Sequence, residues 1–432
     1  MTDRRGFLKS TMAGTAGLII GSSATKTFGE DSGLIEVSPA DAQPTRITND
    51  VDVLVVGGGT AGTIAAIQAG RAGASTLIVE RDSLLGGTIT TGGVSFPGLF
   101  DAWGEQIIAG IGWELVRDCV LLDGGSFPDF SDFPGSDRHW RNQLRINPFL
   151  YSLMAEEKCE QAGVEIAYYE FPLSVTATDS GWHVNCVGFG TQRTVNCKQI
   201  VDCTGGAEVV AMAGYSRLRE SEIQPGTHNY QLDTATNPGR SRLNGGFAYV
   251  CDADSSNSRT LTATNLKGRK ALLARVRSGN HRLMHMQPEV SVRETYRIDG
   301  ETVITVDDYL SGHYFEDSIC NAYYPVDLHR CGSSIYKKYH TDGAFPKIPL
   351  SALVPKSSTN IIVAGRSVSS DRLANSGLRV QASCMAMGQA AGAAAALAAE
   401  RDTTPLSLPI DDIRTLLQEH DAIIPVDPNA MS

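Results

Sequence analysis

Residues 53–93 read VLVVGGGTAGTIAAIQAGRAGASTLIVERDSLLGGTITTGG, and this stretch decides the fold. An apolar run, 53–56, leads into a glycine cluster, and an alanine-rich helical pattern follows to about residue 72. A second apolar run, 76–79, ends at Glu80, which stands 18 residues after Gly62. Strand, glycine turn, helix, strand and acid in this order are typical of a dinucleotide-binding βαβ unit. An ordinary βαβ unit without a ligand is the alternative, and the complete order of elements disfavours it.

Each part of this unit has a separate physical role. Gly57 allows the tight turn, Gly59 lets the backbone approach a pyrophosphate, and Gly62 lets the helix pack close to the strand. The pyrophosphate would sit on the free N–H groups at the positive end of the helix. The acid can accept hydrogen bonds from the adenosine ribose. The expected cofactor contacts in this unit are Gly57, Gly59, Thr60, Ala61, Gly62, Glu80 and Arg81.

The residues after the acid favour one dinucleotide over another. The segment 84–88 reads LLGGT, and its glycines can bring a loop back beside the ribose and pyrophosphate. A loop of this kind suits a permanently held dinucleotide better than an exchanging one, so the sequence predicts FAD rather than NAD. Gly86, Gly87 and Thr88 join the expected cofactor contacts.

Two later segments return to the same fold. An apolar strand over 200–203 ends in Thr204-Gly205, and ligands of parallel sheets bind at the carboxyl ends of the strands. A second strand over 360–364 ends in Gly365-Arg366. Arg379 and Val380 then open a helix whose small residues, 388–396, permit close packing on a neighbour. Its positive N-terminus would stabilise a reduced, anionic flavin. The strand ends and this helix start add six expected cofactor contacts: Thr204, Gly205, Gly365, Arg366, Arg379 and Val380.

The N-terminus predicts where the protein works. Residues 3–9, DRRGFLK, form a twin-arginine export motif, and an apolar stretch over 11–20 precedes a small-residue cleavage site after Ala24. We therefore expect a signal peptide over 1–24, a leader over 25–48, and export of the folded protein to the periplasm by the twin-arginine translocase. A short basic helix at the start of a cytoplasmic protein is the alternative.

Composition excludes several classes of protein. The net charge of −11 argues against nucleic acid and anionic membrane surfaces as partners. The apolar stretch is too short and too rich in Gly and Thr for a stable membrane span. Nine scattered cysteines without a C-x-x-C disfavour a dithiol reductase, an iron–sulfur cluster and a zinc ribbon, and no other metal site is expected. Most of these cysteines are expected to be small buried side chains.

The fold class predicted is α/β, with a Rossmann-like FAD-binding domain built on a parallel sheet and an inserted α+β cap domain. The FAD-binding domain is discontinuous and takes residues 49–94, 145–212 and 346–432. The substrate or cap domain takes residues 95–144 and 213–345. Within these ranges we expect a helix over 149–162, a strand over 164–169 and antiparallel hairpins over 172–197.

The chain resembles the FAD-dependent oxidoreductases of the glutathione-reductase-like superfamily, over roughly residues 50–400. It looks closest to an often secreted bacterial branch of that superfamily. The resemblance implies non-exchanging FAD, a mixed parallel sheet and a substrate domain that caps the flavin. The segments that carry it, besides those quoted, are AGIGWEL (109–115), VDCTGGAEVVAMAG (201–214), VRETYRIDGE (292–301), FEDSI (315–319), YPVDLH (324–329), IPLSALVPK (348–356) and LRVQASCMAMGQAAGAAAALA (378–398).

Two features separate this chain from a simple member of that superfamily. Related sequences are expected to carry a His where Arg372 stands, just before the last long helix, so a different substrate or direction of reaction is expected if that His acts in proton transfer or flavin contact. A second G-x-G-x-x-G is missing, because Gly188-Phe189-Gly190 lies between strand-like runs. Electrons would then pass to or from a quinone, a cytochrome, a dye-like acceptor or O₂ rather than NAD(P)H.

Candidate catalytic residues follow from the chemistry of hydride transfer, which needs a base or acid for the accompanying proton. His329 shares a strand face with Asp327, and His313 is a weaker candidate. Arg293, Arg297 and Arg379 could clamp an anionic group, although an ion pair within the fold is favoured for Arg297. Trp103, Trp113 and Trp140 could form platforms for a sugar ring or an apolar substrate, but packing in the core is favoured for at least two of them.

Three functions stay open at this point. The first is an exported flavoenzyme that oxidises a small organic substrate and passes electrons to a partner carrier. The second is a flavoenzyme that reduces or isomerises an activated double bond with electrons from a partner protein. The third is an assembly protein in which FAD has no catalytic role.

Overall fold

A seven-stranded sheet carries the predicted βαβ unit at its centre, in a computed structural model that describes residues 43–234, 244–279, 281–332 and 334–427. The sheet has the order β5-β2-β1-β8-β7-β6, and β18 also pairs with β8. Its strands are β1 (Thr45–Val56), β2 (Thr76–Glu80), β5 (Glu165–Tyr168), β6 (Phe171–Thr178), β7 (Gly181–Gly188), β8 (Thr191–Asp202) and β18 (Ile361–Val363). The mixed sheet confirms the predicted α/β class.

The sheet is parallel around the glycine turn and antiparallel towards one edge. β1 pairs in parallel with β2 and β8, and β2 with β5 and β8 with β18. β6 and β7 form an antiparallel hairpin that pairs with the first half of β8, whereas β18 pairs with its last residues. The carboxyl ends of β1, β2, β8 and β18 therefore meet at one edge, where ligands of parallel sheets bind.

One strand boundary differs from the sequence prediction. The segments 193–197 and 200–203 were expected as separate strands, but β8 runs through both. No glycine or proline interrupts the chain between them, so the strand continues from the hairpin into the parallel part. β1 begins at Thr45, ahead of the predicted start of the folded part at residue 49. Its first half is a strand because it pairs with the first half of β8.

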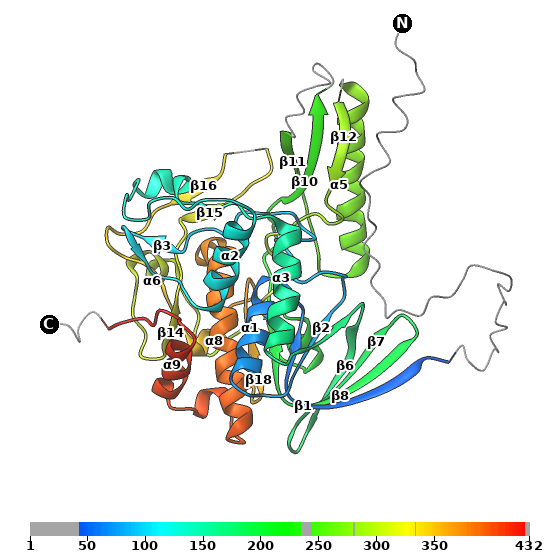
Figure 1. Ribbon diagram of the computed structural model, residues 1–432, viewed down its shortest axis with the longest axis vertical. Coiled ribbons are helices and arrows are strands. Elements are labelled where there is room, and N and C mark those ends of the chain that lie inside the picture. The colour runs from blue at the N-terminus through cyan, green and yellow to red at the C-terminus, as the bar shows by residue number, and fades with distance from the viewer. Residues whose placement is uncertain (1–42, 235–243, 280, 333, 428–432) are drawn as a thin grey trace, which may run out of the picture. The chain divides into compact units, whose positions relative to one another are not determined.

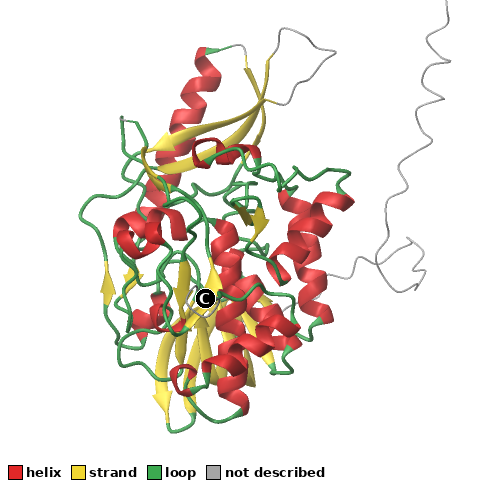
Figure 2. Cartoon of the chain, turned by 90° about the vertical axis from the view of Figure 1, so that its left-hand side faces the viewer, coloured by secondary structure: helices red, strands yellow, loops and turns green. Residues whose placement is uncertain are grey.

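Helices cover one face of the sheet, as Figure 2 shows. Val53 and Val55 face the larger core with these helices, whereas Leu54 and Val56 face a second core that includes the β6–β8 hairpin. The helices of the chain are α1 (Thr60–Arg71), α2 (Ile111–Leu122), α3 (Pro148–Gln161), α4 (Glu208–Met212), α5 (Ser258–Ser278), α6 (Val306–Ser311), α7 (Arg372–Leu378), α8 (Gln381–Glu400) and α9 (Ile410–Glu419), with 3₁₀ turns at 136–141, 350–352 and 405–407.

The long helix α8 packs directly on α1. A Cβ on Gly388 would lie 2.2 Å from the Ala61 carbonyl oxygen, and one on Gly392 would lie 2.3 Å from that of Ala65. This confirms the predicted close packing and identifies α1 as the neighbour. α8 is long and apolar enough to cross a membrane by those criteria alone, but 89% of the relevant window is buried inside the protein, as in a core helix.

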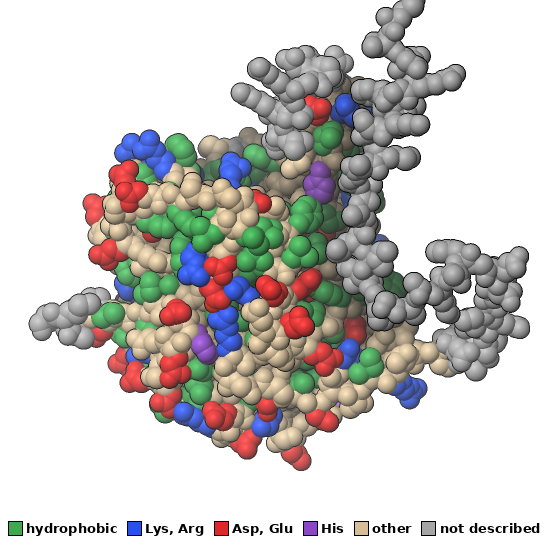
Figure 3. All heavy atoms as spheres, in the orientation of Figure 1, with side chains coloured by type: hydrophobic (Ala, Val, Ile, Leu, Met, Phe, Trp, Pro, Cys, Tyr) green, Lys and Arg blue, Asp and Glu red, His purple; other side chains and the backbone are tan. Residues whose placement is uncertain are grey.

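Short strands make up the rest of the chain. A three-stranded antiparallel sheet, β11-β10-β12, lies beside α5 (Figure 1). From Pro44 onward the chain forms one compact unit, and the predicted domain boundaries within it stay predictions. Acidic and basic side chains are interspersed on the face in Figure 3. The remaining strands are β3 (Asp101–Ala102), β4 (Glu105–Gln106), β9 (Arg217–Leu218), β10 (Gly226–Thr234), β11 (Asn244–Val250), β12 (His281–Met286), β13 (Arg297–Ile298), β14 (Ser318–Asn321), β15 (Val326–Leu328), β16 (Tyr336–Lys338) and β17 (Lys347–Pro349).

Candidate active site

The glycine turn between β1 and α1 forms one wall of a long cleft. Gly57 has a φ of +97°, which only glycine adopts readily, and a Cβ there would lie 2.7 Å from the Cys203 carbonyl oxygen. A Cβ on Gly62 would lie 1.8 Å from the Gly57 carbonyl oxygen, so this glycine lets α1 start close to the turn. At Gly59 the same position is open, with no atom within 4 Å. The turn is therefore crowded on its protein side and open at Gly59.

Glu80 stands at the end of β2, on the adjoining wall of the cleft. Its Oε2 accepts a hydrogen bond from the Gly58 N–H at 2.6 Å, and Oε1 accepts one from the Asp82 N–H at 2.8 Å. Burial raises the pKa of Glu80 to about 7, although both backbone N–H groups act against that rise. A buried carboxyl that braces the glycine turn in this way is well placed to accept further hydrogen bonds from hydroxyl groups in the cleft.

The loop after Glu80 returns to the glycine turn, as the LLGGT segment predicts. The Gly86 N–H donates to the Gly58 carbonyl at 2.8 Å, and the Thr60 hydroxyl donates to the Gly86 carbonyl at 3.1 Å. A Cβ on Gly87 would lie 2.9 Å from the Gly59 Cα. The two chain segments thus approach each other closely, and Gly59 and Gly87 both line the cleft.

Most of the predicted cofactor contacts line this one cleft. Gly62, Gly86 and Gly365 instead shape the backbone around it, and Val380 lines a second cavity. Gly365 has a φ of +100°, and a Cβ there would touch Ala61. The predicted residues that line the cleft are Gly57, Gly59, Thr60, Ala61, Glu80, Arg81, Gly87, Thr88, Thr204, Gly205, Arg366 and Arg379.

A second cavity adjoins the far end of the cleft, where the carboxyl end of β18 and the start of α8 meet. Arg366 donates there to the carbonyls of Gly205 at 2.7 Å and Val292 at 3.0 Å, which fixes its guanidinium. The two spaces adjoin, because six residues line both of them. The shared residues are Thr88, Ser291, Val292, Arg366, Arg379 and Gln381.

Asp327 and His329 lie together in this second cavity. His329 Nε2 stands 2.8 Å from Asp327 Oδ2, as their spacing along one strand face predicts. Burial alone would raise the pKa of Asp327, but the bond with His329 and the charge of Arg379 outweigh it and hold that pKa below its ordinary value. Burial lowers the pKa of His329, with a further contribution from Arg293, against the opposing effect of Asp327. The pair is therefore a neutral imidazole held by an ionised carboxylate.

The ionised carboxylate decides which imidazole nitrogen holds the proton. A carboxylate only accepts hydrogen bonds, so Nε2–H of His329 donates to Asp327 and the lone pair is on Nδ1. A neutral imidazole oriented by a carboxylate is the arrangement of a general base.

Arg293 and Arg379 are both brought to this cavity, from separate segments. Arg379 donates to the Asp327 backbone carbonyl at 3.0 Å and stands 3.7 Å from its carboxylate. Arg293 donates to the Pro225 carbonyl and lies over the ring of Tyr249, 5.4 Å from its centroid. Burial and the neighbouring charge of Arg379 lower the pKa of Arg293 to about 10.

Other candidates lie elsewhere. His313 is exposed, lines neither space, and stacks edge-on against Phe315. Arg297 forms an ion pair with Glu220 at 2.5 Å, as favoured for it from the sequence. Arg372 lines neither space and pairs with Glu294 at 2.8 Å.

The three candidate tryptophans, Trp103, Trp113 and Trp140, line neither the cleft nor the second cavity. Trp103 and Trp113 pack against the main core, in agreement with the packing role favoured for two of them, and Trp140 is 62% exposed. The part of the chain that the structure describes holds no group of three or more potential metal ligands.

The second cavity also contains residues that the sequence did not single out as site residues. Tyr324 has its pKa raised to about 12 by burial and by Asp327, so it is a neutral phenol, and its hydroxyl accepts a hydrogen bond from Gln143 at 2.9 Å. Lys337 and Thr227 also line the cavity. YPVDLH carried the only sequence signal, because its tyrosine lies on the same short segment as the histidine.

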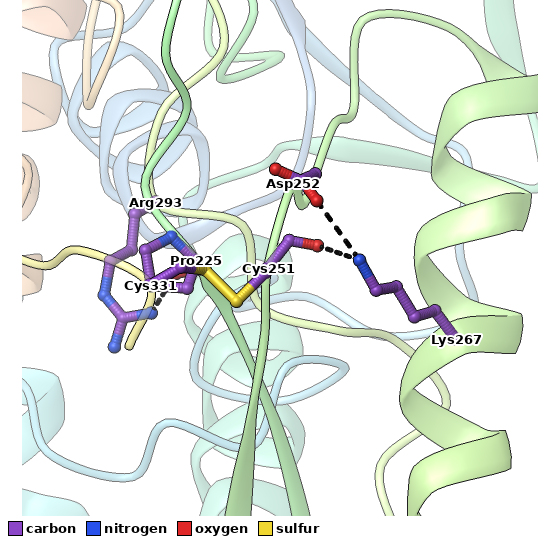
Figure 4. The surroundings of a disulfide bond; sticks show 6 residues. All are labelled: Pro225, Cys251, Asp252, Lys267, Arg293 and Cys331. Atoms are coloured by element: carbon purple, nitrogen blue, oxygen red, sulfur yellow. Dashed lines mark hydrogen bonds and ion pairs between the residues drawn. A yellow bond between two sulfur atoms is a disulfide. The ribbon is translucent and has the colours of Figure 1, made fainter. Parts of the chain in front are cut away.

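A disulfide between Cys251 and Cys331 lies beside this cavity and was not predicted from the sequence. It joins the residue after β11 to the segment two residues after His329, across 80 residues of chain. Figure 4 shows Arg293 and Pro225 next to this bond, with Lys267 on its other side donating to the Cys251 carbonyl at 2.8 Å. The seven other cysteines are free and buried, as expected.

The cleft fits FAD by its own chemistry. α1 starts without a side-chain cap, so its first N–H groups are free to bind a pyrophosphate beside the open position at Gly59. The cleft encloses about 1150 Å³ with the solvent at its mouth included, which is large enough for a dinucleotide. Where the cleft meets the second cavity, Arg379 Nε and Gln381 Oε1 are buried without a partner, as expected of groups that face a bound molecule.

Comparison with known proteins agrees with this fit. The family model described as "FAD dependent oxidoreductase" matches residues 52–265 and 258–417. No curated protein matches the chain. Many solved structures also align with the chain, among them three whose identities and TM-scores are too low to carry an argument.

They are a geranylgeranyl bacteriochlorophyll reductase-like protein from Thermoplasma acidophilum (11% identity, 87% of this chain and 83% of that one, TM-score 0.42), the OxyS anhydrotetracycline hydroxylase from Streptomyces rimosus (14%, 86% and 66%, 0.43) and the p-nitrophenol 4-monooxygenase PnpA from Pseudomonas putida DLL-E4 (12%, 89% and 92%, 0.43). The chain spans about two thirds of the OxyS chain. At these TM-scores the alignments add nothing about substrate, whereas the family match covers most of the chain. The protein therefore belongs to the FAD-dependent oxidoreductase family, and it is an enzyme that uses FAD.

Proposed function

We propose that this protein is an exported oxidoreductase that oxidises a small organic substrate in the second cavity and passes the electrons to an acceptor other than NAD(P)H. One observation carries the proposal: the Asp327–His329 pair lies in a cavity that shares a wall with the FAD cleft. FAD supplies a hydride acceptor when it is bound. The protein must then bind the substrate and take the proton that accompanies the hydride.

His329 is suited to take that proton. Its lowered pKa keeps the imidazole neutral near neutral pH, and Asp327 stabilises the imidazolium that forms. In the balanced reaction the substrate C–H bond gives up a hydride and its O–H or N–H bond gives up a proton to Nδ1. The product is a carbonyl compound or an imine, and two electrons leave later to a quinone, a cytochrome or O₂.

Both parts of the predicted cap domain contribute to this cavity. Phe96, Gly98 and Gln143 come from the range 95–144, and Thr227 and His329 come from 213–345. The two ranges thus enclose the substrate together, which supports a cap role for them.

Export to the periplasm is supported from two sides. The twin-arginine segment, residues 1–24, lies outside the described residues and stays a sequence prediction. The Cys251–Cys331 disulfide supports export independently, because disulfides persist in oxidising compartments such as the periplasm.

The double variant Arg4→Lys/Arg5→Lys should leave the protein in the cytoplasm of a host with a twin-arginine translocase. Secretion of this variant at the wild-type level would contradict this route of export.

The reaction is tested by anaerobic bleaching of the flavin absorbance near ~450 nm. Pools of sugars, hydroxy acids, amines and phenols are added to the purified holoenzyme, and one pool is expected to bleach it. The His329→Gln variant should retain FAD and bleach far more slowly with the same pool. If no pool bleaches the wild-type flavin while an activated alkene reoxidises chemically reduced enzyme, the protein is a reductase, with Tyr324 the candidate proton donor.

A further inference from the structure

The second cavity is positively charged in a protein that is acidic overall. Its lining includes four cationic side chains, Arg293, Lys337, Arg366 and Arg379, but only one acid, Asp327. With His329 neutral, the formal charge of the lining is +3, whereas the whole chain carries −11. Cations gathered around one cavity repel one another: burial is the main cause of the lowered pKa of Arg293, and the charge of Arg379 adds to it. An arrangement of this kind is stabilised when an anion occupies the cavity.

The hydrogen-bonding capacity of these cations is only partly used. Arg366 is held by two backbone carbonyls, and Arg293 donates to one, that of Pro225. Arg379 shares Asp327 with His329, and its Nε is buried without a partner. Guanidinium groups bind carboxylates through paired N–H donors, so Arg293 and Arg379 have the donors that a substrate carboxylate needs.

Uncharged groups in the same wall point to a ligand as well. The Thr227 hydroxyl is buried without a partner, and the Thr227 side chain is only 8% exposed. Gln381 Oε1 is also without a partner, in a residue 5% exposed. Buried polar atoms are almost always hydrogen-bonded, so several unpaired ones around one cavity indicate that a polar molecule belongs there. Apolar side chains also line the cavity: Val94, Phe96, Val292, Ile335 and Val380.

We propose that the substrate is a small carboxylic acid, held by Arg293 and Arg379 through its carboxylate, with its oxidisable carbon close to that group. Arg379 and His329 both contact Asp327, so the anion site and the base are one side chain apart. A 2-hydroxy or 2-amino acid has the matching chemistry, since its carboxylate is bonded to the carbon that bears the O–H or N–H group. The inference rests on the proposed function for the reaction but not for the binding.

The binding test uses benzoate and benzamide, which have the same shape and differ in charge. Each is titrated into the holoenzyme, and binding is followed by calorimetry and by the shift in the flavin absorbance. Benzoate should bind at least about tenfold more tightly than benzamide, because hydrogen bonds to charged groups are the stronger ones. Arg293→Met and Arg379→Met should each weaken benzoate binding by about tenfold or more and leave benzamide binding unchanged.

Two further variants keep this test interpretable. Arg293→Lys retains the charge and should bind benzoate between the wild type and Arg293→Met. Arg282→Met removes an exposed arginine that lines neither space, so it should bind benzoate as the wild type does. The melting temperature and flavin content of each variant separate loss of the site from loss of the fold.

The outcomes distinguish this inference from the proposed function. Equal binding of benzoate and benzamide, or benzoate binding that is indifferent to both arginines, would overturn the carboxylate site. Tighter binding of inorganic phosphate than of benzoate would assign the cavity to a phosphate monoester instead, which also overturns it. If an uncharged alcohol bleaches the flavin and no acid does, the oxidation stands and the carboxylate inference fails. If benzoate binds through the two arginines but no pool bleaches the flavin, the carboxylate site stands and the proposed oxidation fails.

Discussion

The two ends of the active-site cleft are built in opposite ways. At the nucleotide end, the features that fit a dinucleotide are mainly backbone: the Gly57–Gly62 turn and the start of α1, with Glu80 beside them. At the proposed substrate end, the second cavity is lined mainly by side chains, which come from segments scattered over the chain between residues 88 and 381. A site made of backbone restricts substitution at the glycines that shape it. A site made of side chains can change its chemistry by substitution without changing the fold. The predictions below test that division.

The largest effect is expected at Gly62. Its Cβ would overlap the Gly57 carbonyl oxygen, so Gly62→Ala must push α1 away from β1. Backbone cannot yield as a side chain does, and we expect a loss of several kcal/mol, about 3 or more, with little folded protein recovered. Gly59→Ala is the matched control, since no protein atom lies within 4 Å of the added methyl group. That variant should fold with a near-normal melting temperature but retain little FAD.

The same contrast explains what the sequence could and could not reveal. The nucleotide end is continuous in sequence from Gly57 to Glu80, so spacing alone identifies the turn, the helix and the acid. In the second cavity, the local sequence signal is the segment that carries Tyr324, Asp327 and His329. That Arg293 and Arg379 meet there depends on how loops and short strands pack, which no periodic pattern encodes. His313 has the right chemistry but lies on the surface, and burial of a lone histidine cannot be read from its neighbours.

The second prediction concerns catalysis at the substrate end. His329→Gln keeps a side chain that can hydrogen-bond Asp327 but removes the basic nitrogen. We expect the rate of flavin reduction, measured by anaerobic stopped flow, to fall about 10²–10⁴-fold. FAD content and melting temperature should stay close to those of the wild type, because the nucleotide end is untouched. A variant that retains FAD and reduces it at the wild-type rate would remove His329 from the proton transfer.

The third prediction tests how the substrate end is held together. Cys251→Ala/Cys331→Ala removes a cross-link over 80 residues, which should cost about 4 kcal/mol and lower the melting temperature. The Cys331 segment joins β15 to β16, which together carry Asp327 and Lys337. KM should therefore rise while FAD binding is retained. Dithiothreitol should lower the melting temperature of the wild type to that of the variant and leave the melting temperature of the variant unchanged. A loss of FAD that accompanies the rise in KM would show that the two ends are not independent.

The smallest effect is expected in the pH dependence of the reaction. His329 must be neutral to accept a proton, and its pKa is lowered below the ordinary 6.5, so kcat/KM should fall only at pH values more acidic than that. The charge of Arg293 contributes to this shift by disfavouring the imidazolium. Removing that charge in Arg293→Met should raise the pKa of His329, and the acidic limb should move to higher pH by about one unit or less.

The direction of this shift separates two roles of Arg293. If Arg293 only binds substrate, its loss lowers kcat/KM at every pH by the same factor and the acidic limb does not move. If it also sets the charge state of the base, the limb moves upward, and Arg293→Lys, which keeps the positive charge, should restore it. Arg282→Met lies outside the cavity and should leave both the height and the position of the profile unchanged. A limb that moves to lower pH in Arg293→Met would contradict the electrostatic argument, because removing a cation cannot make the imidazolium harder to form.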